Sequence, residues 1–217
     1  MFQVRIHGRG GQGVVTAAEM LSIAAFREGH HAQAFPTFGS ERTGAPVVAF
    51  CRINEKEIRV REPIIQPDAL IIQDATLLHQ DAVFSGLRPG GYVLINSSRD
   101  ADRLGLAEFA TDLGRARLIT LPATELALRH LGRPVPNAVL LGGFCALTGL
   151  VSLESVDAAI RDKFSGDVAE GNIAAAAEAF ALVRDGSATA RGPRKAPDGE
   201  SRTKAIWTKE TARAQAD

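Results

Sequence analysis

Apolar residues in this chain fall into short runs that alternate with longer amphipathic segments. Four runs have strand character and end in polar or turn residues, at 2–6, 69–72, 92–95 and 118–121. Helical spacing of apolar residues covers 124–131, 137–150, 152–164 and 172–184, and a further helix starts near Gly13. Because alternating strands and helices favour parallel pairing, we predict an α/β fold: a Rossmann-like, mostly parallel sheet with helices on both faces.

Residues 31–61, between the first predicted helix and the apolar run at 69–72, have a pattern typical of antiparallel strands. Residues 31–35 form a predicted strand that ends at Pro36. Residues 47–53 and 58–61 flank the short polar turn Asn54-Glu55-Lys56, which predicts an antiparallel hairpin between them. We expect this hairpin at one edge of the sheet.

The predicted helices differ in how they begin and in what they bury. Asn137 is expected to cap the helix at 137–150, which is apolar nearly all round and is therefore expected to be buried. Ser152 opens a Ser-Leu-Glu-Ser stretch typical of a helix start. The alanine-rich helix at 172–184 permits close approach by another element or chain, although helix propensity alone also explains its composition.

A glycine-rich turn follows the first strand and leads into the first helix. It reads Gly8-Arg9-Gly10-Gly11-Gln12-Gly13 and matches the G-x-G-x-x-G spacing at three glycines. A helix that starts there directs its free amide groups and the positive end of its dipole at the turn, which favours a phosphate or pyrophosphate ligand. The alternative is a tight strand-to-helix turn without a ligand.

A nicotinamide cofactor would require an acidic residue at the end of the second strand to bind a ribose hydroxyl. No Asp or Glu closes the strand at 31–35, and Glu28 lies in the tail of the preceding helix. The sequence therefore disfavours NAD on this chain. A polar loop at 36–46 follows instead, at the same carboxyl edge of the sheet. Within it Arg42 could clamp an anion, or Glu41 and Arg42 could form a solvated ion pair.

Further polar residues follow the other predicted parallel strands. Asp74, Asn96 and the turn at 122–124 are expected at the carboxyl edge that carries the glycine turn, where open α/β sheets bind ligands. Helix capping or turn chemistry explains Asp74 and Asn96 equally well. His7 adjoins the glycine turn, where it has either an ordinary structural role or a role in orienting a ligand.

Several motifs occur together over residues 1–185. The glycine turn continues as Val14-Val15-Thr16-Ala17-Ala18, and the later matching segments are 33–46, 122–125, 131–134, Asn137, 140–143 and Asn172. In these motifs the chain resembles the gamma subunit of 2-oxoacid:acceptor oxidoreductases, the pyruvate:ferredoxin oxidoreductase group. Two features depart from that pattern: Gly142-Gly143 stands where the family more often has Gly-Ala, and the tail past Gly186 has no recognised counterpart.

The resemblance implies a subunit of a larger complex. Alpha, beta and ferredoxin-like delta subunits would hold thiamine diphosphate and iron–sulfur clusters, decarboxylate a 2-oxoacid and pass electrons to ferredoxin or another acceptor. The gamma subunit would complete the complex and is associated with coenzyme A. The residues expected to contact coenzyme A are Gly8, Arg9, Gly10, Gly11, Gln12, Gly13, Ser40, Glu41, Arg42 and Asn96.

Two alternatives remain open at this point. The chain could be a purely structural subunit of such a complex, with no role in binding coenzyme A. It could also be a stand-alone nucleotide-binding oxidoreductase, although no pattern for a nucleophile, an acid–base pair or a ribose-binding acid is found in the sequence. We therefore predict no catalytic residue and no metal ligand on this chain.

Composition narrows the partners. The 217 residues include 25 Lys and Arg against 25 Asp and Glu, so no net charge favours nucleic acid or an anionic membrane. No apolar stretch is long enough to cross a bilayer, and the start lacks a signal-peptide pattern, which predicts a cytoplasmic protein. Cys51 and Cys145 each lie in an apolar run, so we predict that both thiols are buried. An iron–sulfur cluster usually needs four thiolates, and these two lie far apart, so we predict no cluster on this chain.

The composition changes at the end of the predicted domain. Residues 1–185 form the α/β domain, whereas 186–217 are rich in Gly, Ser, Pro and charge and cannot fold alone. Trp207 is the only tryptophan of the chain and lies in this polar tail. The tail is expected to be disordered or to dock on a partner subunit.

Overall fold

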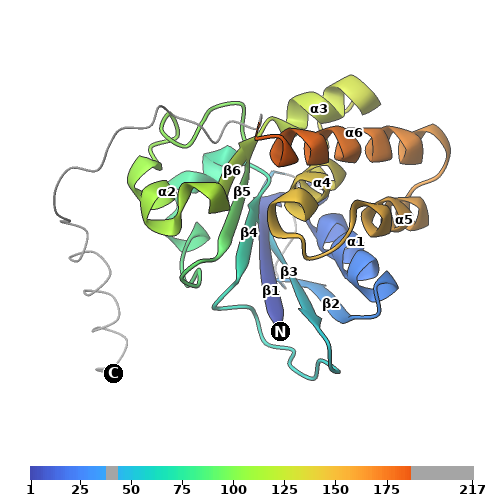
Figure 1. The fold of residues 1–217 in the computed structure, drawn as a ribbon, viewed down its shortest axis with the longest axis horizontal. Coiled ribbons are helices and arrows are strands. Elements are labelled where there is room, and N and C mark those ends of the chain that lie inside the picture. The colour runs from blue at the N-terminus through green and yellow to red at the C-terminus, as the bar shows by residue number, and fades with distance from the viewer. Residues whose placement is uncertain (38–43, 187–217) are drawn as a thin grey trace.

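The computed structural model describes residues 1–37 and 44–186, and its centre is a six-stranded sheet (Figure 1). The strand order is β2-β3-β1-β4-β5-β6. The strands are β1 (Phe2–Arg9), β2 (His31–Pro36), β3 (Pro46–Asn54), β4 (Ala69–Ile72), β5 (Tyr92–Asn96) and β6 (Leu118–Leu121). The pairs β1–β4, β4–β5 and β5–β6 are parallel, whereas β3 is antiparallel to both β1 and β2. The predicted mostly parallel sheet with an antiparallel edge pair is confirmed.

The antiparallel pair, however, has a different partner from the predicted one. β3 pairs with the preceding strand β2, which forms the edge of the sheet, and residues 58–61 form no strand. Since β1 and β2 occupy both ladders of β3, no hydrogen-bonding edge is left for the segment that follows. Instead the guanidinium of Arg52 donates to the carbonyl groups of Val60 and Glu62. The predicted hairpin between 47–53 and 58–61 is therefore wrong.

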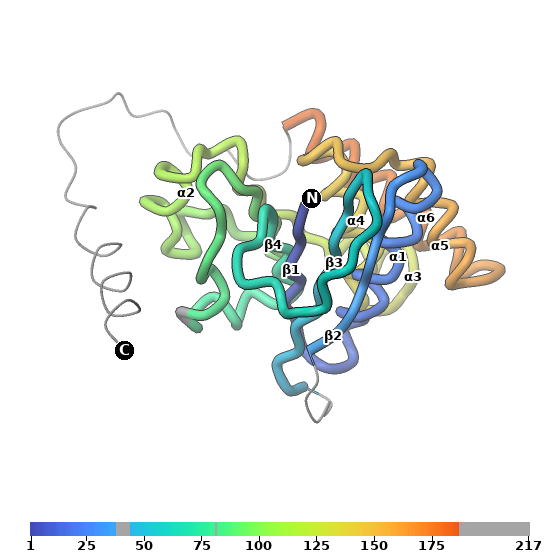
Figure 2. The backbone as a smooth tube through the Cα atoms, turned by 90° about the horizontal axis from the view of Figure 1, so that it is seen from below, coloured from blue at the N-terminus to red at the C-terminus, as the bar shows by residue number. Residues whose placement is uncertain are grey.

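Helices cover the two faces of the sheet unequally (Figure 2). One face carries α1 (Val14–Arg27), α3 (Ala123–Leu131), α4 (Asn137–Thr148), α5 (Leu153–Lys163) and α6 (Gly166–Arg184). The other carries α2 (Ala107–Leu113) and the short 3₁₀ helices Ala75–His79 and Asp81–Val83. Each side has its own buried apolar cluster, and the cluster under the five helices is the larger. No helix in the described part of the chain is long and apolar enough to cross a membrane.

The closest helix packing joins α4 and α6. A Cβ atom at Gly142 would collide with the carbonyl oxygen of Ala176, and one at Gly143 would lie 2.9 Å from Leu121 Cδ2. The alanine-rich helix is thus approached by an element of the same chain. It also begins at Gly166, about 1.7 turns before the predicted start at residue 172.

One predicted helix cap differs in the structure. Asn137 is the first residue of α4 rather than its cap, and Pro136 occupies the cap position. The Oδ1 atom of Asn137 accepts a hydrogen bond from its neighbour, the amide of Ala138, at 2.8 Å. Its side chain packs against Gly13 of the glycine turn, so Asn137 joins α4 to the start of α1.

Candidate functional site: the glycine turn at the start of α1

The turn after β1 has the predicted strand–turn–helix geometry. Helix α1 begins at Val14 behind Gly13, whose φ of 71° is left-handed. No side chain caps this end and no acidic residue lies in the first turn. Gly11, with φ of 94°, has open space where a side chain would project. The first amide groups of α1 and the positive end of its dipole therefore face the turn without a partner side chain.

Two glycines are required by packing alone. A Cβ atom at Gly8 would lie 2.6 Å from Val14 Cγ2 and 3.2 Å from the Cβ of Gln73, so only glycine lets α1 start this close to the sheet. At Gly13 a side chain would collide with Asn137, and the left-handed backbone disfavours any residue with a Cβ. These glycines shape the turn whether or not it binds a ligand.

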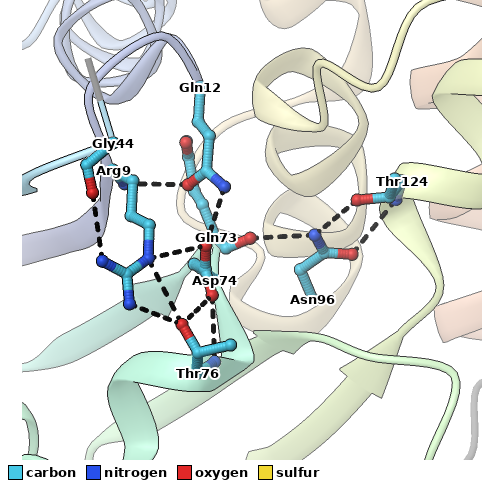
Figure 3. Close-up of polar contacts among 8 residues, drawn as sticks. All are labelled: Arg9, Gln12, Gly44, Gln73, Asp74, Thr76, Asn96 and Thr124. Atoms are coloured by element: carbon cyan, nitrogen blue, oxygen red, sulfur yellow. Dashed lines mark hydrogen bonds and ion pairs between the residues drawn. The ribbon is translucent and has the colours of Figure 1, made fainter.

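The turn is fixed by its own hydrogen bonds and by the end of the 36–46 loop. The Oε1 atom of Gln12 accepts from the amide of Arg9 at 2.8 Å, and its Nε2 atom donates to Asp74 Oδ2 at 2.9 Å (Figure 3). The amide of Gly10 donates to the carbonyl of Ala45 at 2.9 Å, and the amide of Gly44 donates to that of Gly10 at 3.1 Å. The described end of the loop, Gly44 and Ala45, thus lies at the carboxyl end of β1, the edge where the loop was predicted.

Arg9 points into this network. Its guanidinium donates to the carbonyl of Gly44 at 3.0 Å and to Thr76 Oγ1 at 2.7 Å, and its Nε lies 3.2 Å from Asp74 Oδ2 (Figure 3). The guanidinium therefore joins the glycine turn to the 36–46 loop and to the end of β4. Its charge is balanced locally by Asp74.

Asp74 is held ionised by its neighbours. Burial acts to raise the pKa of this carboxyl, but hydrogen bonds from the hydroxyl and amide of Thr76 and from Gln12, with the charge of Arg9, outweigh burial and lower it. Asp74 also caps the 3₁₀ helix by accepting from the Thr76 amide at 2.9 Å. The structure gives Asp74 the capping role that the sequence left open.

Asn96 ties three elements together at the same edge. Its Nδ2 atom donates to the carbonyl of Gln73 and to Thr124 Oγ1, both at 2.8 Å, and its Oδ1 atom accepts from the Thr124 amide at 3.1 Å (Figure 3). Asn96 thus holds the end of β4 and the first turn of α3 against β5. The other predicted contacts, Ser40, Glu41 and Arg42, lie outside the described residues.

His7 and the two cysteines are buried away from this chemistry. Burial, helped by the charge of Arg5, lowers the pKa of His7 to about 3, and the neutral ring accepts a hydrogen bond from Arg5 Nε at 2.9 Å. Arg5 in turn donates to the carbonyl of Val83, on the face away from α1. Burial raises the pKa of Cys51 and of Cys145 to about 12, so the predicted buried thiols are confirmed.

One polar residue of this edge was missed by the sequence analysis. Gln73 directly follows β4 and is only 1% exposed, yet neither Oε1 nor Nε2 has a hydrogen-bond partner within residues 1–37 and 44–186. Its position between an apolar strand and Asp74 was the available signal, but a glutamine there carries no motif. Among the described residues no group of three His, Cys, Asp or Glu side chains could hold a metal ion.

This fold and its glycine turn match a known family. The family model for pyruvate ferredoxin/flavodoxin oxidoreductase covers residues 3–182. The chain belongs to that family. The oxidoreductase family is thus the one that the sequence motifs resembled, and the match spans the sheet and all six helices almost to the end of α6.

Relatives within the oxidoreductase family align with this chain in sequence over most of their length. The pyruvate/ketoisovalerate oxidoreductases common subunit gamma of Thermococcus kodakarensis is 47% identical over 180 residues, covering 83% of this chain and 96% of that one. The pyruvate synthase subunit PorC of Methanosarcina barkeri is 49% identical over 161 residues, covering 74% and 85%. The resemblance to gamma subunits is confirmed.

Two solved structures from the same oxidoreductase group share the fold. The PORC subunit of pyruvate oxidoreductase from Thermotoga maritima superposes with a TM-score of 0.70 at 34% identity, covering 83% of this chain and 95% of that one. The gamma subunit of a keto/oxoacid ferredoxin oxidoreductase from Geobacter sulfurreducens gives a TM-score of 0.65 at 25% identity, covering 84% and 95%.

Proposed function

We propose that this chain is the gamma subunit of a multisubunit 2-oxoacid:acceptor oxidoreductase and contributes to coenzyme A binding during oxidative decarboxylation. The printed names of its relatives, a common subunit gamma and a PorC subunit, support the place in a complex. Alpha, beta and ferredoxin-like delta subunits are its proposed partners. They hold thiamine diphosphate and the iron–sulfur clusters and deliver electrons to ferredoxin or another acceptor.

The coenzyme A role rests on one observation, the uncapped start of α1 behind an open glycine turn. Backbone amides and the helix dipole at such an end suit the phosphate oxygens of coenzyme A. When bound, coenzyme A supplies the thiol that accepts an acyl group. The described residues of this chain would hold its anionic part and have no group that reacts with the acyl carbon.

Contacts within the site also limit which residues can bind the ligand. Gly11 and the first amides of α1 are free to meet a ligand, whereas Arg9 and Gln12 are engaged with Asp74, and Asn96 with Thr124. We assign Arg9 and Asn96 to shaping the site. Arg42 remains the proposed cation that completes it.

A second function is favoured by the same internal bonding. Because hydrogen bonds of Gly10, Gln12 and Arg9 within the chain hold the turn together, the chain could act as a structural subunit that uses the turn only for packing. The two functions make opposite predictions for a charge placed on the open side of the turn.

Gly11 offers a matched pair of variants for that test. Gly11→Asp and Gly11→Asn add side chains of the same shape in open space, and both residues tolerate a left-handed backbone better than others do. A carboxylate there repels a bound phosphate, whereas the amide does not. Calorimetry of coenzyme A on the purified complex is expected to show about tenfold weaker binding for Gly11→Asp than for Gly11→Asn.

The outcome separates the two functions. Equal affinity in both variants and the wild type, or no binding of coenzyme A by the wild-type complex, contradicts the ligand role and favours the structural one. An acidic residue near a helix start stabilises the helix, so a weaker affinity in Gly11→Asp cannot be ascribed to loss of fold.

A further inference from the structure

The buried side chain of Gln73 is an unusual feature of the carboxyl edge. Its backbone is fully used, because its amide donates to the carbonyl of His7 at 2.7 Å and its carbonyl accepts from Asn96. Its side-chain amide, in contrast, has neither a donor nor an acceptor partner in the part of the chain that the structure describes. Leaving such a group buried and unpaired destabilises the fold, so the site calls for a partner that the described residues do not provide.

The unpaired amide lies beside the start of α1. Gln73 comes two residues after Ile71, which faces the helix-covered side of the sheet, and the Cβ of Gln73 packs next to Gly8. The side chains of Gln73 and Gln12 overlap in Figure 3, and both lie next to Gly8: the Cβ of Gln73 is 3.2 Å and the Oε1 of Gln12 is 3.1 Å from the Cβ position of that glycine. The uncapped helix end and the unpaired amide are independent observations, and both point to a ligand at this place.

We propose that Gln73 pairs with a ligand group that presents a donor and an acceptor side by side. This inference rests on the proposed function. A phosphate oxygen would satisfy Nε2 and leave Oε1 unpaired, whereas a secondary amide or the edge of an adenine ring satisfies both. Coenzyme A contains both groups, in its pantetheine arm and in its nucleotide.

Access to the amide requires one side chain to turn aside. The Oε1 atom of Gln12 lies 3.1 Å from the Cβ position of Gly8, beside Gln73, and the Gln12 side chain is held only through its terminal amide. On binding, the Gln12 side chain releases these two bonds and the ligand pairs with Gln73 in its place.

Gln73→Met tests the pairing in the purified complex. The variant removes both unpaired polar atoms and keeps the side-chain length, so the unfolding temperature is expected to stay the same or rise. The affinity for coenzyme A is expected to fall about tenfold, the loss of one or two good hydrogen bonds. Gln73→Leu repeats the test if Gln73→Met fails to assemble.

Gln33→Met is the matched control. Gln33 also has a buried Oε1 atom without a partner, but it lies on β2 beside Arg52, which in turn pairs with Gln3 at the far end of β1 from the glycine turn. The same substitution there should change stability in the same direction and leave coenzyme A affinity unchanged.

Two fragments of the ligand identify the group that pairs. If the adenine edge is the partner, Gln73→Met lowers the affinity for 3′-phosphoadenosine 5′-diphosphate and leaves the affinity for pantetheine unchanged. If the pantetheine amide is the partner, Gln73→Met lowers the affinity for pantetheine and leaves that for 3′-phosphoadenosine 5′-diphosphate unchanged. Unchanged coenzyme A affinity in Gln73→Met overturns the inference, and the proposed function survives if Gly11→Asp still binds more weakly than Gly11→Asn. Absence of coenzyme A binding in the wild type overturns both.

Discussion

The starts of α1 and α5 solve the same physical problem in opposite ways. At α5, Ser152 Oγ accepts from the amide of Ser155 at 3.2 Å, and Glu154 lies in the first turn. The carboxylate of Glu28 further accepts from the amide and hydroxyl of Ser152, at 2.6 and 2.7 Å. At α1 the cap position holds Gly13, with neither a capping side chain nor an acidic residue in the first turn.

The difference leaves different backbone groups available at the two helix starts. The start of α5 is completed by side chains of its own chain and needs nothing else. The start of α1 keeps its amides and dipole free behind a turn whose shape is fixed by Gly8, Gly13 and the Arg9–Asp74 pair. A helix end whose amides lack such partners is able to bind an anion, and that is the role proposed for α1. Three predictions test this contrast.

The largest effect is expected from giving α1 an ordinary residue at its cap. Gly13→Ala places a side chain on a left-handed backbone and against Asn137, so it should lower the free energy of unfolding by about 2–4 kcal/mol. Urea denaturation measures the loss. The double variant Gly13→Ala with Asn137→Ala should recover the part due to the collision, and strict additivity would show that the two residues do not interact.

A smaller effect is expected at the capped helix. Ser152→Ala removes the cap of α5 and should cost about 1 kcal/mol of stability, whereas Ser152→Thr keeps the hydroxyl and most of that stability. Coenzyme A affinity of the complex should not change in either variant. A weaker affinity in Ser152→Ala would contradict the division of roles between the two helix ends.

The smallest effect concerns pH at the same capped end. Burial acts to raise the pKa of Glu28, but hydrogen bonds from Ser152 and Ser155 outweigh it and lower the pKa below its ordinary value of 4.5. Since the folded pKa is depressed, Glu28 stabilises the fold above that value, and its contribution is lost as the pH falls through the lowered pKa. The free energy of unfolding of the wild type should therefore fall slightly as the pH drops below 4.5, and that part of the fall should be missing in Glu28→Gln. Unfolding curves of both proteins over this pH range measure the difference.

Local patterns in the sequence predicted the parts of the molecule that local physics determines. The glycines after β1 predict a tight turn into a helix. The parallel pairing of β4 and β5 brings Asp74 and Asn96 to the same edge of the sheet. The pairing of β3 was predicted wrongly because the choice between 58–61 and β2 depends on competition between distant segments. The ion pair of Arg9 was not predicted, because its partner Asp74 lies 65 positions later in the sequence.

Other features of the site have no sequence signal at all. Whether the buried amide of Gln73 is paired depends on side chains from β1, β5 and the glycine turn, which meet only in the folded chain. Asn137 was predicted to be a cap because such residues favour helix starts, yet Pro136 takes that position and Asn137 packs on Gly13.

Hydrogen–deuterium exchange of the purified complex with and without coenzyme A tests the anion site most directly. If the first amides of α1 bind phosphate oxygens, peptides that span residues 10–17 exchange more slowly when coenzyme A is added, and the start of α5 exchanges at an unchanged rate. If coenzyme A slows exchange only in other parts of the complex and the exchange rate at the start of α1 stays the same, the assignment of this helix end to the ligand is contradicted.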